Sequence, residues 1–393
     1  MALATDAFSA GTAERVIAFL EPIGTVWINA VRATVLPLVV PLLIVGIAGG
    51  NDRKLVGTLG IRSFAVFLTM LLFCATMVAV FAPAMFELLH LDPAGTARLR
   101  ESATIELPPA EALTMRGWLL SLVPNNVIRA AADGALLPVV LFTIVYAFAL
   151  SKLPDDTCAQ HVDFFRGMSQ VMLLVVRWIL ALAPIGIFAV AVTMGQRLGA
   201  SVIGAIGFYL AMVIGAHVIV IVLIYLLVVG SGRATLRDFG RALLPGQIVG
   251  FGTRSSLAAL PALVQGANEH LRLPQTVVAF VLPLAVSVFK LTSALYWIIG
   301  ALFVARLYGI SLDATDIVTV GAASVMLSFS TPGIPSGGML LQLPLYAHIG
   351  LPAEGIGILI ALDTVPDMFK TALNVTADMA TAVLVTPRRM LQR

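Results

Sequence analysis

Residues 363–378 read DTVPDMFKTALNVTAD. Five of these side chains are charged or carry an amide, and they follow one another at spacings of four, three, four and four residues: Asp363, Asp367, Lys370, Asn374 and Asp378. On an α-helix those spacings place all five on one face. A solvated surface helix would show the same spacing, but the residues around them are mostly Ile, Leu, Ala, Val and Met. The pattern therefore predicts a polar face that points into the protein from an apolar helix.

The rest of the chain is similarly apolar. Of its 393 residues, 59% are hydrophobic and 11% are charged, and the mean hydropathy is +1.00. Soluble domains carry roughly 25% charged residues. At about 20 residues per crossing, the apolar stretches allow about seven or eight spans. We predict an all-α polytopic membrane protein, in which ionisable residues at membrane depth mark function because each costs roughly 2.5 to 3.5 kcal/mol to insert.

The charges outside the spans indicate the topology. Lys and Arg gather around residues 53–62, 152–166, 233–241 and 388–393, which the positive-inside rule assigns to the cytoplasm. The net charge of +3 reflects these loop ends, so no nucleic acid partner is expected. Two further segments are polar or mixed in character. They are an expected extracellular loop at residues 90–115 and an expected interfacial segment, without a cleavable signal, at residues 1–25.

Two apolar stretches in the last third are interrupted by small, hydroxylated or helix-breaking residues. They read GFGTRSSLAALP at residues 250–261 and SFSTPGIPSGG at residues 328–338, and long spans follow at residues 274–307 and 352–386. A backbone that breaks at membrane depth is tolerated only where protein buries it or where it lines a cavity. Kinked helices are one interpretation, but paired interruptions that carry hydroxyls and Arg254 favour a transporter binding site.

Other chemistry has little support in the sequence. Lys290 lies in the middle of a span, too far from either end to snorkel, so it needs a buried anion. The deep charges balance, because Arg254 and two lysines face three aspartates, and neutrality needs no metal ion or cofactor. The histidines are dispersed and nucleotide-binding motifs are missing, so no catalytic residue is expected. A nucleophilic pair of Ser255 or Ser256 with Lys290 is the enzyme alternative, but it gives the carboxylates no role.

Three runs resemble the glutamate transporter homologues, the dicarboxylate/amino acid:cation symporters: TRSSLAALP, STPGIPSGG and DTVPDMFKTALNVTAD. Supporting similarities lie at residues 35–46, 122–142 and 183–189, and the resemblance covers residues 21–386. It implies a homotrimer in the inner (plasma) membrane, where scaffold helices hold transport domains that carry substrate by an elevator movement. The two interrupted segments would be re-entrant hairpins, and the second would act as the extracellular gate.

The implied organisation has four parts. Residues 1–25 are the interfacial segment, residues 26–168 are mainly scaffold helices, and residues 169–241 link the scaffold to the transport domain. Residues 242–393 form the transport core. Its elements are a hairpin at 242–270, a helix at 274–307, a hairpin at 315–348 and a helix at 352–386. The family's first scaffold helix has no counterpart before residue 21, so we expect a reduced member or a late start.

The resemblance also assigns site residues. Asp367 is similar to the aspartate that holds the substrate's amino group, and Asn374 to the amide that meets its α-carboxylate. Lys370 stands where family members that carry acidic amino acids have arginine. It is expected to pair with the carboxylate of the substrate's side chain, or alternatively to be a structural counter-ion of Asp363. The other expected substrate-binding residues form the hairpin tips or supply nearby hydroxyls: Arg254, Ser255, Ser256, Ser293, Thr331, Ile334, Gly338 and Thr371.

The ion sites depart from the family pattern. Family members have Asn-Met-Asp-Gly-Thr in the penultimate helix, whereas residues 289–293 here read FKLTS. The amide and carboxylate that ligate sodium are thus replaced, and Lys290 stands beside the remaining ligand, Asp378. A fixed ammonium repels sodium, so we predict that Lys290 pairs with Asp378 and that transport is independent of sodium. Lys290 could alternatively release its proton during the transport cycle. The predicted ion-coupling residues are Lys290, Asp378 and Asp363.

We therefore predict a secondary active transporter of amino acids, acidic or polar, that is proton-coupled or an exchanger. Asp367 favours an amino acid over a plain dicarboxylate, because a substrate without an ammonium gives a buried carboxylate nothing to pair with. A dicarboxylate symporter of the same family and a passive solute or anion channel are the alternatives. No enzyme activity is expected, and the expected partners are the substrate, the lipid bilayer and further copies of the chain.

Overall fold

The computed structural model describes residues 10–49, 53–89, 120, 123–133, 135–182, 184–185, 188, 205–329 and 338–391. Within these ranges the regular secondary structure is helical and contains no strand. Three of the described helical segments are long and apolar enough to cross a membrane: Gly57–Glu87, Ile206–Gly230 and Gln275–Tyr308. The predicted all-α membrane fold is confirmed in these parts, whereas the predicted loop at residues 90–115 lies outside the described residues.

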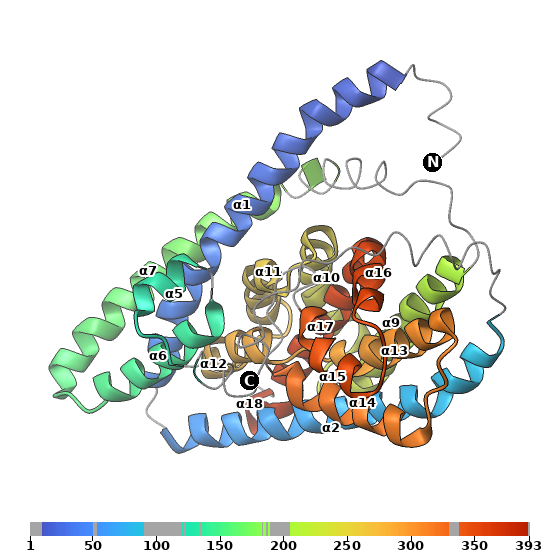
Figure 1. Ribbon diagram of the computed structural model, residues 1–393. Coiled ribbons are helices and arrows are strands. Elements are labelled where there is room, and N and C mark those ends of the chain that lie inside the picture. Colours follow the sequence, from blue (N-terminus) through green and yellow to red (C-terminus); the bar gives the residue numbers. More distant parts are fainter. Residues whose placement is uncertain are drawn as a thin grey trace.

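Two long helices form a pair on one side of the molecule. α1 (Ala10–Ala48) runs beside α7 (Asp155–Ala181) (Figure 1), and the Trp27 indole N–H donates to the Ile179 carbonyl oxygen at 3.1 Å. α6 (Leu136–Leu150) packs against α1 and against the short α5 (Val127–Ala132). α1 continues without interruption from the predicted interfacial segment into the first predicted span.

One helix lies at the centre of the C-terminal part. Besides its chain neighbour in the preceding helix, α17 (Thr364–Val385) packs against α2 (Arg53–Glu87), α9 (Ala205–Gly230), α10 (Leu236–Thr253), α11 (Ser256–Glu269) and α12 (Gln275–Val288). Every residue in 370–383 is buried. The polar face predicted from the spacing of its charges therefore points into protein, as expected.

The first interrupted segment is the tip of a helical hairpin formed by α10 and α11. Arg254 adopts a left-handed conformation with a φ of 53°, and the Ser255 side chain caps the first turn of α11. At the base of the hairpin the helices approach closely, because a Cβ atom on Gly266 would lie 1.9 Å from the Ala242 carbonyl oxygen. The break predicted within residues 250–261 therefore lies at Arg254 and Ser255.

Both long spans predicted for the last third are divided in the structure. The span predicted at residues 274–307 consists of α12 and α13 (Ser293–Tyr308), with a break at residues 289–292. The span predicted at residues 352–386 consists of α16 (Glu354–Leu362) and α17, which meet at Asp363. Residues 289–292 contain no proline or glycine, so tertiary contacts must hold the first break open.

The second interrupted segment is described only at its two ends. α14 (Ala314–Ser328) begins at a capping box formed by Asp313 and Asp316. The described chain resumes with a short helix, η3 (Leu340–Gln342), and continues into α15 (Leu343–His348). Residues 330–337, which include most of the predicted second tip, lie outside the described residues.

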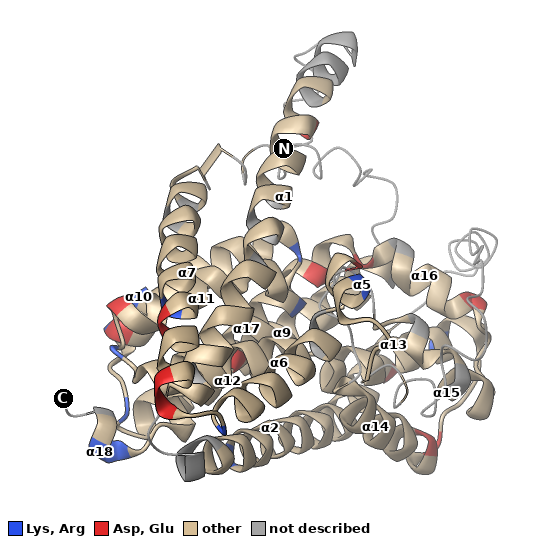
Figure 2. Cartoon of the chain, turned by 90° about the vertical axis from the view of Figure 1, so that its left-hand side faces the viewer, with Lys and Arg blue, Asp and Glu red and all other residues tan. Residues whose placement is uncertain are grey.

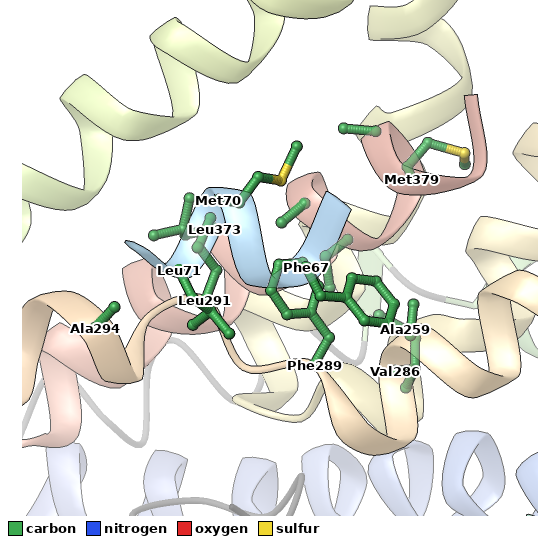
Figure 3. Close-up of a cluster of buried hydrophobic side chains, with 14 of the residues drawn as sticks. Phe67, Met70, Leu71, Ala259, Val286, Phe289, Leu291, Ala294, Leu373 and Met379 are labelled. Atoms are coloured by element: carbon green, nitrogen blue, oxygen red, sulfur yellow. The ribbon is translucent and has the colours of Figure 1, made fainter. Parts of the chain in front are cut away.

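Apolar side chains surround the break between α12 and α13. Phe289 stacks on Phe67 of α2, with ring centroids 4.2 Å apart, and Leu291 and Leu373 are fully buried close to Leu71 (Figure 3). These apolar side chains offer the backbone no hydrogen-bond partner. The N–H and C=O groups at residues 289–292 must therefore find hydrogen bonds within the protein.

Arginines gather where the end of α9, α2 and the C-terminus meet (Figure 2 shows the basic residues of α18). Arg233 donates to the Thr386 carbonyl oxygen at the end of α17, and Arg388 of α18 (Arg388–Leu391) donates to the Ser231 carbonyl oxygen at 3.2 Å. Partial burial and the nearby charges of Arg388 and Arg62 lower the pKa of the Arg233 guanidinium. Three loops that the positive-inside rule groups together therefore lie at one end of the molecule.

Candidate functional site

Lys370 is the centre of a charge cluster on α17. Its Nζ atom lies 2.7 and 2.8 Å from the two carboxylate oxygens of Asp363, and 3.2 Å from Oδ1 of Asp367. It also lies 4.3 Å from the ring centroid of Tyr296 on α13, which is a cation–π geometry. Three carboxylate oxygens thus surround the ammonium, which has three N–H donors.

Asp367 has one carboxylate oxygen that the cluster does not use. Its Oδ2 atom is buried and has no hydrogen-bond partner in the described part of the chain. Two carboxylates and one ammonium give the cluster a net charge of −1. A buried oxygen that carries this excess charge is costly unless a cation pairs with it. The hydroxyl of Thr371, another expected site residue, donates to the Asp367 backbone carbonyl at 2.8 Å.

The tip of the α10–α11 hairpin lies level with the charge cluster. A Cβ atom on Gly246 would lie 3.3 Å from the Val375 side chain, and one on Gly250 would lie 3.2 Å from the Thr371 side chain. One turn forward on α10 therefore corresponds to one turn back on α17, and the helices are antiparallel. A further turn brings Arg254 level with the first turn of α17, where Asp367 lies.

The two serines that follow Arg254 are buried. Ser255 and Ser256 begin α11, and each is 3% exposed, whereas Arg254 is partly exposed. The left-handed backbone of Arg254 turns the chain from α10 into α11. The helix that leads to the first predicted tip thus packs along the helix that carries the charge cluster.

Asn374 connects α17 to the break between α12 and α13. Its Oδ1 atom accepts a hydrogen bond of 3.1 Å from the backbone N–H of Thr292. This contact satisfies an N–H group that the broken helix leaves without a helical partner. Because the carbonyl end of the amide faces the break, its NH2 group faces the other way. Ser293, an expected hydroxyl donor, is fully buried at the start of α13.

The direct ion pair predicted between Lys290 and Asp378 is wrong. The Lys290 ammonium donates to the backbone carbonyl oxygens of Val286 and, at 3.4 Å, of Phe289, and it forms no ion pair with a carboxylate of the described residues. The break leaves the last carbonyl groups of α12 without helical partners, at the negative end of the helix dipole. The ammonium therefore caps this end of α12.

Asp378 is fully buried on α17. Neither of its carboxylate oxygens has a hydrogen-bond partner among the described residues. Its charge nevertheless interacts electrostatically with that of Lys290, although the two groups do not touch. The two buried charges thus have opposite signs and interact without direct contact.

The predicted second tip is described only at its C-terminal end. Thr331 and Ile334 lie outside the described residues, and Gly338 is buried where the described chain resumes. Across the ranges that the structure describes, no three His, Cys, Asp or Glu side chains gather as metal ligands would.

One polar residue of this region was not predicted from the sequence. His217 of α9 is fully buried, and its ring contacts the Thr292 hydroxyl at the break. The sequence does contain a signal for this residue, because His217 is the only charged or imidazole side chain in the apolar span Ile206–Gly230. Polar residues within such spans mark function.

The fold and the site define the class of protein. A helical hairpin and a discontinuous helix meet a central helix that carries buried charges, within an all-α membrane fold. Transporters place their substrate sites at such interrupted helices. The sequence profile of the sodium:dicarboxylate symporter family matches residues 1–387. The chain belongs to this family, and it is therefore a secondary transporter.

Similar proteins support this assignment. The proton/glutamate-aspartate symporter of Escherichia coli (strain K12) is 30% identical over 383 residues, which cover 94% of this chain and 85% of that one. The proton/sodium-glutamate symport protein of Bacillus subtilis (strain 168) is 27% identical over 374 residues, with 93% and 85% covered. The C4-dicarboxylate transport protein of Laribacter hongkongensis is 26% identical over 383 residues, with 93% and 83% covered.

These findings confirm several predictions. The family, its glutamate-transporter fold and the plasma-membrane location are as expected. The family and its relatives are transporters and not enzymes. The alternative of an intramembrane Ser/Lys hydrolase is thereby set aside.

Proposed function

We propose that this chain is a sodium-independent carrier of amino acids. The observation that supports the substrate class is the buried Oδ2 atom of Asp367, which has no partner among the described residues. An α-ammonium group would supply the missing positive charge. Asn374, two turns further along the same face of α17, would offer its NH2 group to the α-carboxylate. Together these two residues would recognise the part of the ligand that all amino acids share.

The substrate's side chain is proposed to be acidic. Lys370 is enclosed by Asp363 and Asp367, so we assign it the role of their counter-ion. Arg254, level with the first turn of α17, is then the cation that meets a side-chain carboxylate. The name of the Escherichia coli relative agrees with an acidic amino acid. A plain dicarboxylate, which the name of the Laribacter relative suggests, would leave Asp367 without a cation.

Sodium independence is proposed from the position of Lys290. Its ammonium caps the carbonyl groups at the end of α12 and compensates the charge of Asp378. A sodium ion brought to these oxygens would meet a positive charge already in place. The driving force would then be a proton gradient or exchange of one amino acid for another.

The transport movement is proposed to be an elevator motion within a homotrimer. Residues 242–393 would form the moving core, residues 26–168 mainly the scaffold, and residues 169–241 the link between them. The α10–α11 hairpin and the segment from α14 to α15 would be re-entrant, with the second acting as the extracellular gate. The packing of α10, α11 and α12 around α17 supports a core that moves as one body.

A ligand panel on the purified protein tests the proposed function. Thermal unfolding is measured with L-aspartate, L-glutamate, neutral amino acids and C4-dicarboxylates, each with and without sodium. A ligand present at 100 times its Kd stabilises the folded state by about 2.7 kcal/mol. We expect acidic amino acids to raise the unfolding midpoint by the same amount with and without sodium. Stabilisation by dicarboxylates alone would favour the dicarboxylate symporter instead.

Replacing Lys370 with Met is expected to destabilise the fold by about 3 to 5 kcal/mol, because it leaves two buried carboxylates without their cation. The double variant Lys370→Met/Asp363→Asn should regain part of this stability. Because Asp367 is then unchanged, the double variant should rank acidic and neutral amino acids as the wild type does. Thermal unfolding with each ligand measures both effects. A selective loss of acidic ligands would instead place Lys370 against the substrate's side chain.

A further inference from the structure

His217 faces the interior from a helix that is largely exposed. Only 28% of the most apolar window of α9 is buried, yet His217 itself has no exposed surface. Its Nε2 atom contacts the Thr292 hydroxyl, and the Thr292 backbone N–H donates to Oδ1 of Asn374 at 3.1 Å. A chain of hydrogen bonds therefore leads from α9, through the break between α12 and α13, to α17.

The direction of each hydrogen bond in this chain follows from its partners. Nδ1 of His217 lies 2.6 Å from the Val213 carbonyl oxygen, and a carbonyl oxygen can only accept, so Nδ1 carries the proton. In a neutral imidazole Nε2 is then an acceptor, and the Thr292 hydroxyl must donate to it. A buried imidazolium would need a counter-ion, and His217 pairs with no carboxylate in the described part of the chain.

This chain fixes the orientation of the Asn374 amide. His217 holds the side chain of Thr292. The Thr292 carbonyl oxygen accepts the first helical hydrogen bonds of α13, whereas its N–H donates to Asn374 and not to a helical carbonyl. A backbone N–H can only donate, so Asn374 must turn its oxygen toward Thr292. The NH2 group is then the end of the amide that can meet a ligand. An amide rotated by 180° would present an acceptor, which repels an anionic group.

We propose that His217 is a positioning residue for substrate binding. It does not touch the ligand, and it acts through Thr292 to keep the NH2 group of Asn374 directed at the carboxylate of an amino acid. Groups that orient a binding residue in this way are commonly as important as its own contacts. The inference rests on the proposed function, because it requires a ligand with an anionic group beside Asn374.

The test measures L-aspartate binding to the purified full-length chain by calorimetry, together with thermal unfolding without ligand. We expect His217→Leu and Thr292→Val each to raise the Kd about tenfold, as the loss of one oriented hydrogen bond would. The double variant should bind no more weakly than either single variant, because both break one link. His217→Gln, which places an amide oxygen near the position of Nε2, should restore binding to within about threefold of wild type.

A matched control is Thr381→Val on α17. Thr381 is also fully buried, and its hydroxyl donates to the Ala377 carbonyl of its own helix at 2.8 Å. This variant should leave the Kd within about twofold of wild type, whatever it does to the unfolding midpoint. Lower stability with unchanged affinity in His217→Leu and Thr292→Val, additive losses in their double variant, or a Gln variant as weak as Leu would each overturn the proposal. If the wild type bound no amino acid, both this proposal and the proposed function would fail.

Discussion

Replacing Asp367 with Asn is expected to abolish amino acid binding without unfolding the protein. The change keeps the shape of the side chain but removes the charge that would pair with the substrate's ammonium. Losing one partner of a buried charged contact costs about 2 to 5 kcal/mol, which weakens binding from about 30-fold to several thousandfold. Lys370 retains both oxygens of Asp363 as partners, so the cluster itself should stay paired.

Calorimetry with L-aspartate and thermal unfolding without ligand separate these effects. Asp363→Asn is the matched control, because it removes the other carboxylate of the same cluster. That variant should lower the unfolding midpoint more than Asp367→Asn does, since Asp363 makes the shorter contacts with Lys370. An unchanged L-aspartate Kd in Asp367→Asn would show that the ammonium binds elsewhere.

The polar face of α17 could be predicted because the helical period alone determines it. Residues spaced by three and four share a face whatever surrounds them. The pairing within that face could not be predicted in the same way. Lys370 can reach both Asp363 and Asp367 by spacing, and its closer contact with Asp363 depends on the junction between α16 and α17. Pro366, in the first turn of α17, signals a helix start near that junction, but the sequence does not determine the angle at which the two helices meet.

The break at residues 289–292 explains why the partner of Lys290 was predicted wrongly. The sequence FKLT contains no helix breaker, so a continuous helix was the natural expectation. The break is held by tertiary contacts instead: Phe289 stacks on Phe67, and Thr292 donates to Asn374. In a continuous helix the carbonyl groups near Lys290 would have helical partners, and the ammonium would have to find a carboxylate. Long-range contacts of this kind are invisible to local patterns.

Lys290→Met and Asp378→Asn are each expected to damage folding and uptake severely. Removing one of two compensating buried charges costs about 3 to 5 kcal/mol, because the other charge remains. The double variant should recover part of the loss, since neither charge is then left alone. Ser287→Ala is a suitable control, because this buried hydroxyl of α12 donates only to its own helix, at the Pro283 carbonyl. It should leave unfolding and uptake nearly unchanged.

The dependence of L-aspartate uptake and of thermal unfolding on sodium tests the role proposed for Lys290. The ammonium caps the carbonyls of Val286 and Phe289, so L-aspartate uptake into proteoliposomes should not change when sodium replaces potassium at fixed pH and voltage. In Lys290→Met those carbonyls and the Asp378 carboxylate lose their cation, and sodium should then raise the unfolding midpoint, which it should not do in the wild type. Wild-type uptake that rises with an inward sodium gradient would contradict the role given to Lys290. Wild-type uptake driven by an inward proton gradient, together with a Lys290→Met variant that still exchanges L-aspartate but no longer responds to that gradient, would show that the ammonium itself exchanges the coupled proton.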